Sequence, residues 1–170
     1  MKKKFNLALV PKTLSTQIIQ LSQQLAFMAD TYQLGAESLP HITLCQFYAE
    51  PKRSKEIWQA AKQQLQPQEL KLTFLRVSCD HIGKKLYWIS LMPDSQEELI
   101  CLQQVAASIV GKETKNKYDP HMTLINSRDA QYEVKAGSFI QTYQPITDQF
   151  TLVMGASDEV GQFKKILFRS

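Results

Sequence analysis

The chain contains one five-residue phrase twice, and this repeat constrains its fold more than any other feature. Residues 40–44 read Pro-His-Ile-Thr-Leu and residues 120–124 read Pro-His-Met-Thr-Leu. Each copy alternates apolar and polar residues after a proline, which is typical of a β-strand. Side chains at positions i and i+2 of a strand point to one face. We therefore expect the histidine and the threonine of each copy to project together.

The bulk composition indicates an ordinary globular protein. The 170 residues are 44% hydrophobic and 21% charged, with a net charge of +4 that is compatible with an anionic ligand without requiring one. No apolar run approaches the roughly 20 residues of a membrane span, and the apolar stretch after the first lysines is too short for a signal peptide. Three widely spaced cysteines predict free thiols in a reducing compartment, and no His or Cys residues have zinc-site spacing. We expect a cytoplasmic protein with no metal and no cofactor.

Hydrophobic periodicity predicts alternating strands and helices along the whole chain. The expected strands cover about 5–10, 41–47, 69–78, 85–92, 121–126, 148–156 and 162–169. The expected helices cover about 14–28, 54–66, 95–111 and 129–143. A turn is predicted at residues 80–83, and Ser95 with Glu98 has the spacing of a capping box.

This order is strand–helix–strand–helix–strand written twice, followed by one closing strand. Both copies of the phrase fall on the strand after the first helix of their half. The pattern predicts an α+β fold of duplicated βαβ units, bilobal and pseudo-two-fold symmetric, with largely antiparallel sheets around a central cleft. We expect a single domain over residues 1–170, with lobe-forming repeats of about 5–78 and 85–170.

Two histidine–threonine pairs that face one cleft suit phosphoester chemistry. A histidine transfers protons near neutral pH, so His41 and His121 could act as general acid and general base. Thr43 and Thr123 could donate hydrogen bonds to the phosphate oxygens, where negative charge develops. The alternative for a single histidine on a strand is an ordinary packed or surface residue. Two copies at equivalent positions in the two halves of the chain favour the catalytic interpretation.

The duplicated His-x-Thr phrase resembles the two-histidine phosphoesterase superfamily, which includes the 2'-5' RNA ligase-like proteins and the RNA 2',3'-cyclic phosphodiesterases. The resemblance implies that His41 and His121 are catalytic and that Thr43 and Thr123 bind phosphate. One departure concerns the second motif. Part of the family continues it as His-x-Thr-Leu-Ala-Arg, whereas this chain has Asn126 there and places Arg128 two positions later.

The resemblance implies a metal-independent hydrolase acting on RNA with a 2',3'-cyclic phosphate end or on a cyclic nucleotide. The alternatives are 2'-5' ligation or 2'-5' phosphodiester hydrolysis by the same residues, and a non-catalytic module that binds RNA ends or nucleotides. We expect a monomer.

Several residues next to the two motifs are further candidates. Cys45 shares the face of His41 if the strand alternates strictly, so it could line the cleft. The loop lysines before the second motif could follow an RNA backbone, with a solvated loop as the alternative. Aromatic side chains could stack on a base, although for Phe47 the core is the favoured alternative. The candidates for substrate binding are Tyr48, Tyr118, Phe47 and Lys117, the last with Lys112 and Lys115 in the same loop.

Overall fold

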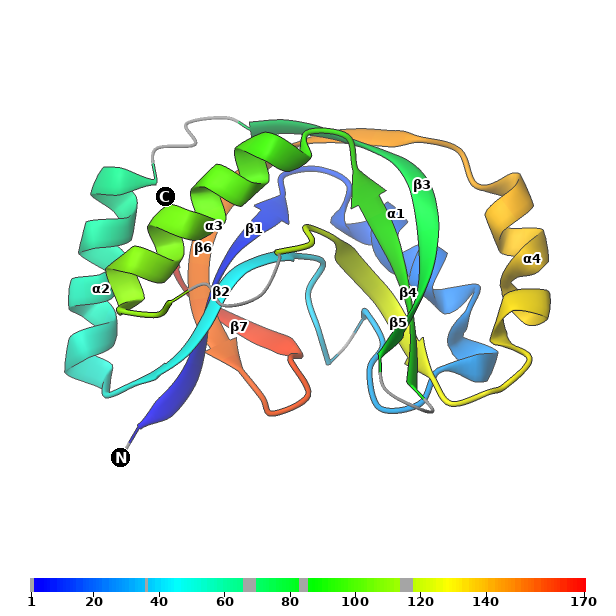
Figure 1. The fold of residues 1–170 in the computed structure, drawn as a ribbon, viewed down its shortest axis with the longest axis horizontal. Helices are drawn as coiled ribbons and strands as arrows, with labels where there is room; N and C mark the ends of the chain where they lie inside the picture. Colours follow the sequence, from blue (N-terminus) through cyan, green and yellow to red (C-terminus); the bar gives the residue numbers. More distant parts are fainter. Residues whose placement is uncertain (1, 36, 66–69, 83–85, 114–117) are drawn as a thin grey trace.

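The computed structural model describes residues 2–35, 37–65, 70–82, 86–113 and 118–170. Within these ranges helices connect most of the strands, except that β4 directly follows β3 and β7 directly follows β6; one short 3-10 helix (η1) follows the first α-helix (Figure 1). In chain order the elements are β1 (Lys3–Pro11), α1 (Ser15–Gln23), η1 (Ala26–Met28), β2 (Ile42–Ala49), α2 (Pro51–Gln64), β3 (Leu70–Ile82), β4 (Leu86–Pro93), α3 (Gln96–Val110), β5 (Met122–Ser127), α4 (Tyr132–Thr142), β6 (Ile146–Ser157) and β7 (Phe163–Arg169).

The strands form one seven-stranded sheet in which every pair is antiparallel. The order is β2-β1-β6-β3-β4-β5, and β7 also pairs with β6. β6 is long enough to join two parts of the sheet, because residues 146–150 pair with β3 and residues 153–157 pair with β7. The α+β class and the antiparallel pairing predicted from the sequence are confirmed, with a single continuous sheet.

Helices from both halves of the chain cover each end of the sheet. α3, from the second half, packs against β2 and α2, whereas α1, from the first half, packs against β5. Figure 1 shows α2 and α3 at one end and α1 and α4 at the other, with the sheet arching between them. Each motif strand therefore rests on a helix from the other half of the chain. The single domain and its two repeats remain predictions.

β1 is buried on both faces from Phe5 to Pro11 because it lies inside the sheet and both faces are covered. Phe5, Leu7 and Leu9 belong to the main hydrophobic core. Ala8 and Val10 face a smaller cluster, which includes Phe163 of β7. The faces of β1 thus differ: one supports the helices, and the other faces the region where the motif residues lie.

A close approach at Gly155 lets β7 complete the smaller cluster. A Cβ atom at this position would lie 2.0 Å from the carbonyl oxygen of Lys165 and 2.7 Å from the ring of Phe163. Both distances are far below van der Waals contact, so any side chain here would push β7 away. Glycine therefore allows Phe163 to pack tightly over β6.

The predicted helices differ from the observed ones at their ends. The first, expected over about 14–28, ends at Gln23, because the chain tightens where the Leu25 N–H donates to the Ser22 carbonyl. The second begins at Pro51 instead of about Ser54, since proline fits the first turn of a helix. The third ends at Gly111 in a left-handed conformation (φ 70°), as expected.

Two local sequence predictions are wrong. The expected turn at 80–83 is not formed by residues 80–82, because β3 continues through Ile82 and pairs there with β4; Gly83 lies outside the described residues. The Ser95 hydroxyl does not cap α3, because it donates to the Asp94 carboxylate. No helix among the described residues is long and apolar enough to span a membrane.

Candidate active site

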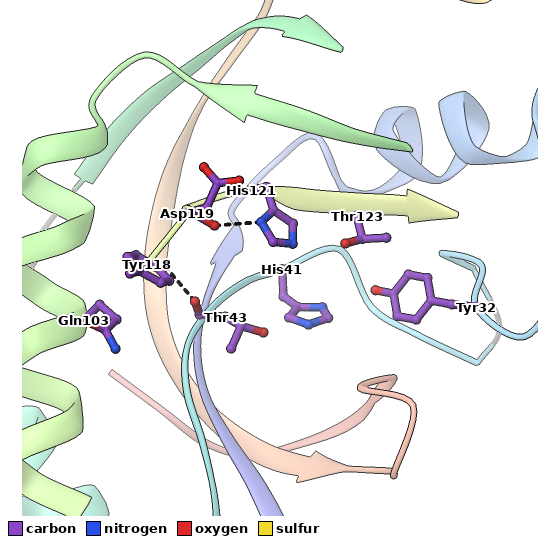
Figure 2. Close-up of a pocket in the computed structure, with 8 residues that line it drawn as sticks. All are labelled: Tyr32, His41, Thr43, Gln103, Tyr118, Asp119, His121 and Thr123. Atoms are coloured by element: carbon purple, nitrogen blue, oxygen red, sulfur yellow. Dashed lines mark hydrogen bonds between the residues drawn. The ribbon is translucent and has the colours of Figure 1, made fainter. Parts of the chain in front are cut away.

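The two motifs meet in one cleft. A cavity of about 420 Å³ is lined by Tyr32, His41, Thr43, Gln103, Tyr118, Asp119, His121 and Thr123 (Figure 2). A second cavity of about 300 Å³ shares five of these residues and extends to Gln46, Trp88 and the β6–β7 turn at residues 159–161. The shared residues are both histidines, both threonines and Tyr32. They lie where the two cavities overlap, at the centre of one cleft.

The curvature of the sheet brings the motif strands together. β2 and β5 are the two outermost strands of the sheet path, yet they approach each other across the cleft. This closeness is a property of the whole sheet, because neither strand pairs with the other.

Each motif strand contains the same irregularity, at the leucine of its phrase. In β2 the register with β1 passes from Thr43 to Cys45 and leaves Leu44 without a partner. In β5 the register with β4 passes from Thr123 to Ile125 and leaves Leu124 without a partner. An extra residue of this kind is a β-bulge, which increases the local twist and redirects the side chains that follow. The repeated phrase thus encodes a bulge at the same distance from each histidine.

Both imidazoles are held in the same way. The Nδ1 of His41 is 2.7 Å from the carbonyl oxygen of Leu39, and the Nδ1 of His121 is 2.7 Å from the carbonyl oxygen of Asp119. A carbonyl oxygen can only accept, so each Nδ1 carries a hydrogen and donates it. In each ring the Nε2 is left as the nitrogen that can exchange a proton in the cleft.

Burial distinguishes the two histidines. His41 is only 6% exposed, and its ring lies 5.1 Å from that of Phe163 between centroids, whereas His121 is exposed. Burial lowers the pKa of His41 to about 4, opposed by the hydrogen bond to Leu39 and assisted by repulsion from His121. His41 is therefore neutral at pH 7, and its Nε2 can accept a proton.

Each motif threonine accepts a hydrogen bond from a buried side chain on the neighbouring strand. The Asn6 Nδ2 donates to the Thr43 Oγ1 at 2.9 Å, and the Ser90 Oγ donates to the Thr123 Oγ1 at 3.5 Å. A threonine hydroxyl that accepts a hydrogen bond from a supporting side chain keeps its own hydrogen for another acceptor. Both threonines can therefore donate into the cleft, and Thr43 is the more firmly held.

The other candidates for substrate binding lie in different environments, and only some of them are near a cavity. Tyr118 lines the larger cavity, and its hydroxyl donates to the Thr43 carbonyl at 2.7 Å. Tyr48 is 55% exposed and donates to Glu159 at 2.6 Å, beside the β6–β7 turn at the rim of the smaller cavity. Phe47 lies in the core, stacked on Phe5, and lines neither cavity. Lys117 lies outside the described residues, as does Lys115.

The bulge also explains where Cys45 lies. Strict alternation predicts that it shares the face of His41, but it is buried in the main core and lines neither cavity. The extra residue at Leu44 shifts the alternation by one position, so that Gln46 follows Thr43 on the cleft face. The carbonyl of Gln46 accepts a hydrogen bond from Lys112 at 2.5 Å.

Sequence reasoning missed several residues of the cleft. Gln103 lies on α3, Asp119 directly precedes the second motif, and Tyr32 lies in the connection between η1 and β2. Only Asp119 had a local signal, namely its position beside the motif. The other two reach the cleft through the packing of elements that are distant in sequence.

Asn126 makes a structural contact outside the cleft lining. It occupies the position that is arginine in the His-x-Thr-Leu-Ala-Arg form of the motif, and its side chain binds the backbone and hydroxyl of Thr31 and the amide of Tyr32. Arg128 is 68% exposed and pairs with Asp30 at 2.7 Å. Arg128 does not line the cleft.

A family model described as the 2'-5' RNA ligase superfamily matches residues 10–146, a span that contains both motifs. No curated protein sequence matches the chain.

Solved structures share the fold at low sequence identity. E. coli LigT complexed with 3'-AMP is 17% identical, with a TM-score of 0.67 over 100% of this chain and 98% of that one. A crystal structure of a phosphoesterase is 16% identical, with a TM-score of 0.58 over 100% and 98%. Kluyveromyces marxianus Usb1 with uridine monophosphate is 10% identical, with a TM-score of 0.52 over 90% and 93%. The same architecture therefore extends over nearly the whole of each chain.

Proposed function

Because the chain belongs to the 2'-5' RNA ligase superfamily, we propose that it is a metal-independent phosphodiesterase that hydrolyses 2',3'-cyclic phosphates at RNA ends or on nucleotides. The observation that carries this proposal is the pair of imidazoles in one cleft, each with its Nδ1 bound to a backbone carbonyl and its Nε2 left for proton transfer. A threonine hydroxyl accompanies each imidazole. This set of groups supplies an acid, a base and donors to the phosphate oxygens.

In the proposed reaction, a water oxygen attacks phosphorus while one histidine takes a proton from that water. The bond between phosphorus and one ribose oxygen then breaks, and the other histidine gives that oxygen a proton. The product is a phosphate monoester, either at the RNA end or on the nucleoside, and the two histidines have exchanged protonation states. Thr43 and Thr123 stabilise the charge on the non-bridging oxygens as it develops.

We assign the base to His41 and the acid to His121. His41 is buried and neutral at pH 7, since its pKa is lowered to about 4, so it is ready to accept a proton. A bound phosphate anion favours the imidazolium and raises this pKa towards the range of an effective base. His121 is exposed, so it can regain a proton from solvent after each turnover.

The substrate proposal follows from what similar proteins bind. The similar structures include one complexed with 3'-AMP and one with uridine monophosphate. We infer that the cleft holds a nucleotide phosphate between the two motifs, with Tyr118 and Tyr48 available to contact the base or the sugar. We also propose that the protein is a monomer and that it is located in the cytoplasm.

The test uses purified protein, 2',3'-cyclic AMP and a short RNA with a cyclic end, in the presence of EDTA. We expect hydrolysis that survives chelation and falls by about two or more orders of magnitude in His41→Ala and in His121→Ala. The third histidine, His81, provides the matched control, because it stacks on Tyr87 and lines neither cavity. His81→Ala should keep the wild-type rate.

Other outcomes would identify the alternatives. Turnover of a 2'-5'-linked dinucleotide without turnover of cyclic phosphates would move the activity to the 2'-5' linkage. Tight nucleotide binding without turnover of either substrate would favour a binding module. Wild-type rates in both His41→Ala and His121→Ala would overturn the mechanism.

A further inference from the structure

A tyrosine hydroxyl belongs to the centre of the cleft although neither motif contains it. Tyr32 is 3% exposed and lines both cavities together with the motif residues. Figure 2 shows its ring on the side of Thr123, with the hydroxyl oxygen directed towards the imidazoles. The buried hydroxyl therefore faces the space in which we place the phosphate.

A chain of hydrogen bonds determines what this hydroxyl can do. The Phe163 amide donates to the Ser38 Oγ at 3.1 Å, and the Ser38 hydroxyl donates its only hydrogen to the Tyr32 Oη at 3.1 Å. Tyr32 accepts in this bond and keeps its own hydrogen. No described residue accepts that hydrogen in the hydrogen bonds of the structure. This arrangement matches Thr43, which accepts from Asn6 and also keeps its hydrogen.

The phenol remains neutral, which makes it a donor. Burial raises the pKa of Tyr32 well above its ordinary value; Asp158 adds to this shift, and the bond from Ser38 opposes it. A neutral hydroxyl at this place donates to an anion without the repulsion that a phenolate would cause.

Rigid contacts hold the ring in place. The Asn126 Oδ1 accepts a hydrogen bond from the backbone N–H of Tyr32 at 2.8 Å. The backbone N–H of Asn126 donates to the Tyr32 carbonyl at 3.0 Å. The ring also packs on Trp88 with 5.7 Å between centroids. Asn126 follows Thr123 by three residues, so one strand positions both hydroxyls. A donor that is fixed before the ligand binds loses little entropy on binding.

We propose that Tyr32 is a third phosphate-binding residue, donating from the Thr123 side of the cleft, and that Ser38 is the positioning residue that directs its hydrogen. The ligand is a phosphate monoanion or dianion, either free or as part of a nucleotide. The expected catalytic effect rests on the function proposed above, whereas the expected binding effect does not.

The experiment compares Tyr32→Phe and Ser38→Ala with Tyr143→Phe. Tyr143 is the matched control, because its hydroxyl donates to the Phe74 carbonyl and it lines neither cavity. Calorimetry measures the binding of inorganic phosphate, 3'-AMP and adenosine, and kinetics measures kcat/KM for 2',3'-cyclic AMP. Circular dichroism establishes that each variant is folded.

We expect Tyr32→Phe to weaken phosphate and 3'-AMP binding by about 10-fold or more, and kcat/KM by about 10- to 100-fold. Ser38→Ala should have a smaller effect, about 3- to 10-fold, in the same direction. Adenosine binding should not change in either variant, which a general loss of structure would not allow. Tyr143→Phe should stay within about twofold of wild type for every ligand.

Equal phosphate binding by wild type and folded Tyr32→Phe would overturn the proposal, and so would a wild-type protein that does not bind phosphate. If Tyr32→Phe weakens phosphate binding but the wild-type protein hydrolyses no cyclic phosphate, the role of Tyr32 in phosphate binding is supported and the proposed function is contradicted. The two proposals can therefore fail separately.

Discussion

The two motif strands, β2 and β5, begin at nearly the same five-residue phrase and have different surroundings. Both contain a bulge at the leucine, and both hold the histidine Nδ1 at 2.7 Å from a carbonyl two residues earlier. However, His41 is buried beside Phe163 and His121 is exposed. The backbone geometry of a short phrase is thus local, whereas the protonation of its histidine depends on what packs against it.

The largest expected effect tests which histidine is the general acid and which is the general base. A nitrophenyl ester of a deoxynucleoside monophosphate has a leaving group that needs no proton. His121→Ala should therefore recover about 10-fold or more of its lost activity on this ester, relative to a cyclic nucleotide. His41→Ala should stay impaired by about 10²- to 10⁴-fold on both substrates, since the attacking water still needs a base.

Steady-state kinetics on the two substrates measures this difference. Recovery in His41→Ala instead of His121→Ala would reverse the assignment of acid and base. The assignment from burial would then be wrong, although both histidines would remain catalytic.

The second prediction concerns the free energy of unfolding. The unfolded chain protonates His41 near its ordinary pKa of 6.5, and the folded protein does so only near pH 4. Between these values the unfolded state binds more protons, so stability falls as the pH is lowered through this range. The loss from this one group is about 3 kcal/mol when fully developed.

Urea denaturation at pH 7 and at pH 4.5 measures this effect in wild type and in His41→Gln. The variant should lose less stability than wild type over the same interval, because glutamine does not titrate. Parallel pH dependence in the two proteins would show that burial does not shift the pKa of His41.

The third prediction removes the hydroxyl donors one at a time. Thr43→Val and Thr123→Val keep the shape of the side chain, and each should lower kcat/KM by about 10- to 100-fold. The loss at Thr43 should be the larger one, because the 2.9 Å bond from Asn6 holds it more firmly than the 3.5 Å bond from Ser90 holds Thr123. A larger loss at Thr123 would show that the distance to the supporting side chain does not determine the contribution of the hydroxyl.

The smallest expected effect comes from those supporting side chains. Asn6→Leu should lower kcat/KM by about 3- to 10-fold, and Ser90→Ala by about threefold or less. The Asn6 Oδ1 is buried without a hydrogen-bond partner, so Asn6→Leu also removes an unsatisfied acceptor, and folding should be retained. Kinetics together with thermal unfolding tests both statements. A folded Asn6→Leu with wild-type kcat/KM would contradict the role of Asn6 in directing Thr43.

The outline of the fold was predictable because periodicity reports burial. Alternation and helical spacing predict the strands and helices to within a few residues, and Gly111 ends α3 as expected. The errors occur where a tertiary partner competes with a local preference. Ser95 bonds to Asp94 instead of capping α3, and residues 80–82 continue a strand because β4 pairs with them.

The candidate site was predictable only in its repeated part. The phrase identifies two histidines and two threonines because each pair lies within three consecutive residues at the start of one strand. Cys45 was misplaced because a bulge cannot be read from alternation alone. Tyr32 was missed because Ser38, Phe163 and Asn126, which hold its hydroxyl and backbone, come from three separate parts of the chain.

The sequence by itself determined the family, the elements and the four motif side chains, because these depend on short-range order along the backbone. Only the tertiary structure decided that the two outermost strands of one sheet face each other, that His41 is dehydrated while His121 is not, and that Tyr32 joins them. These properties depend on sheet curvature and on contacts between distant segments. Burial and hydrogen-bond direction are set by neighbours in space, and those neighbours exist only once the chain has folded.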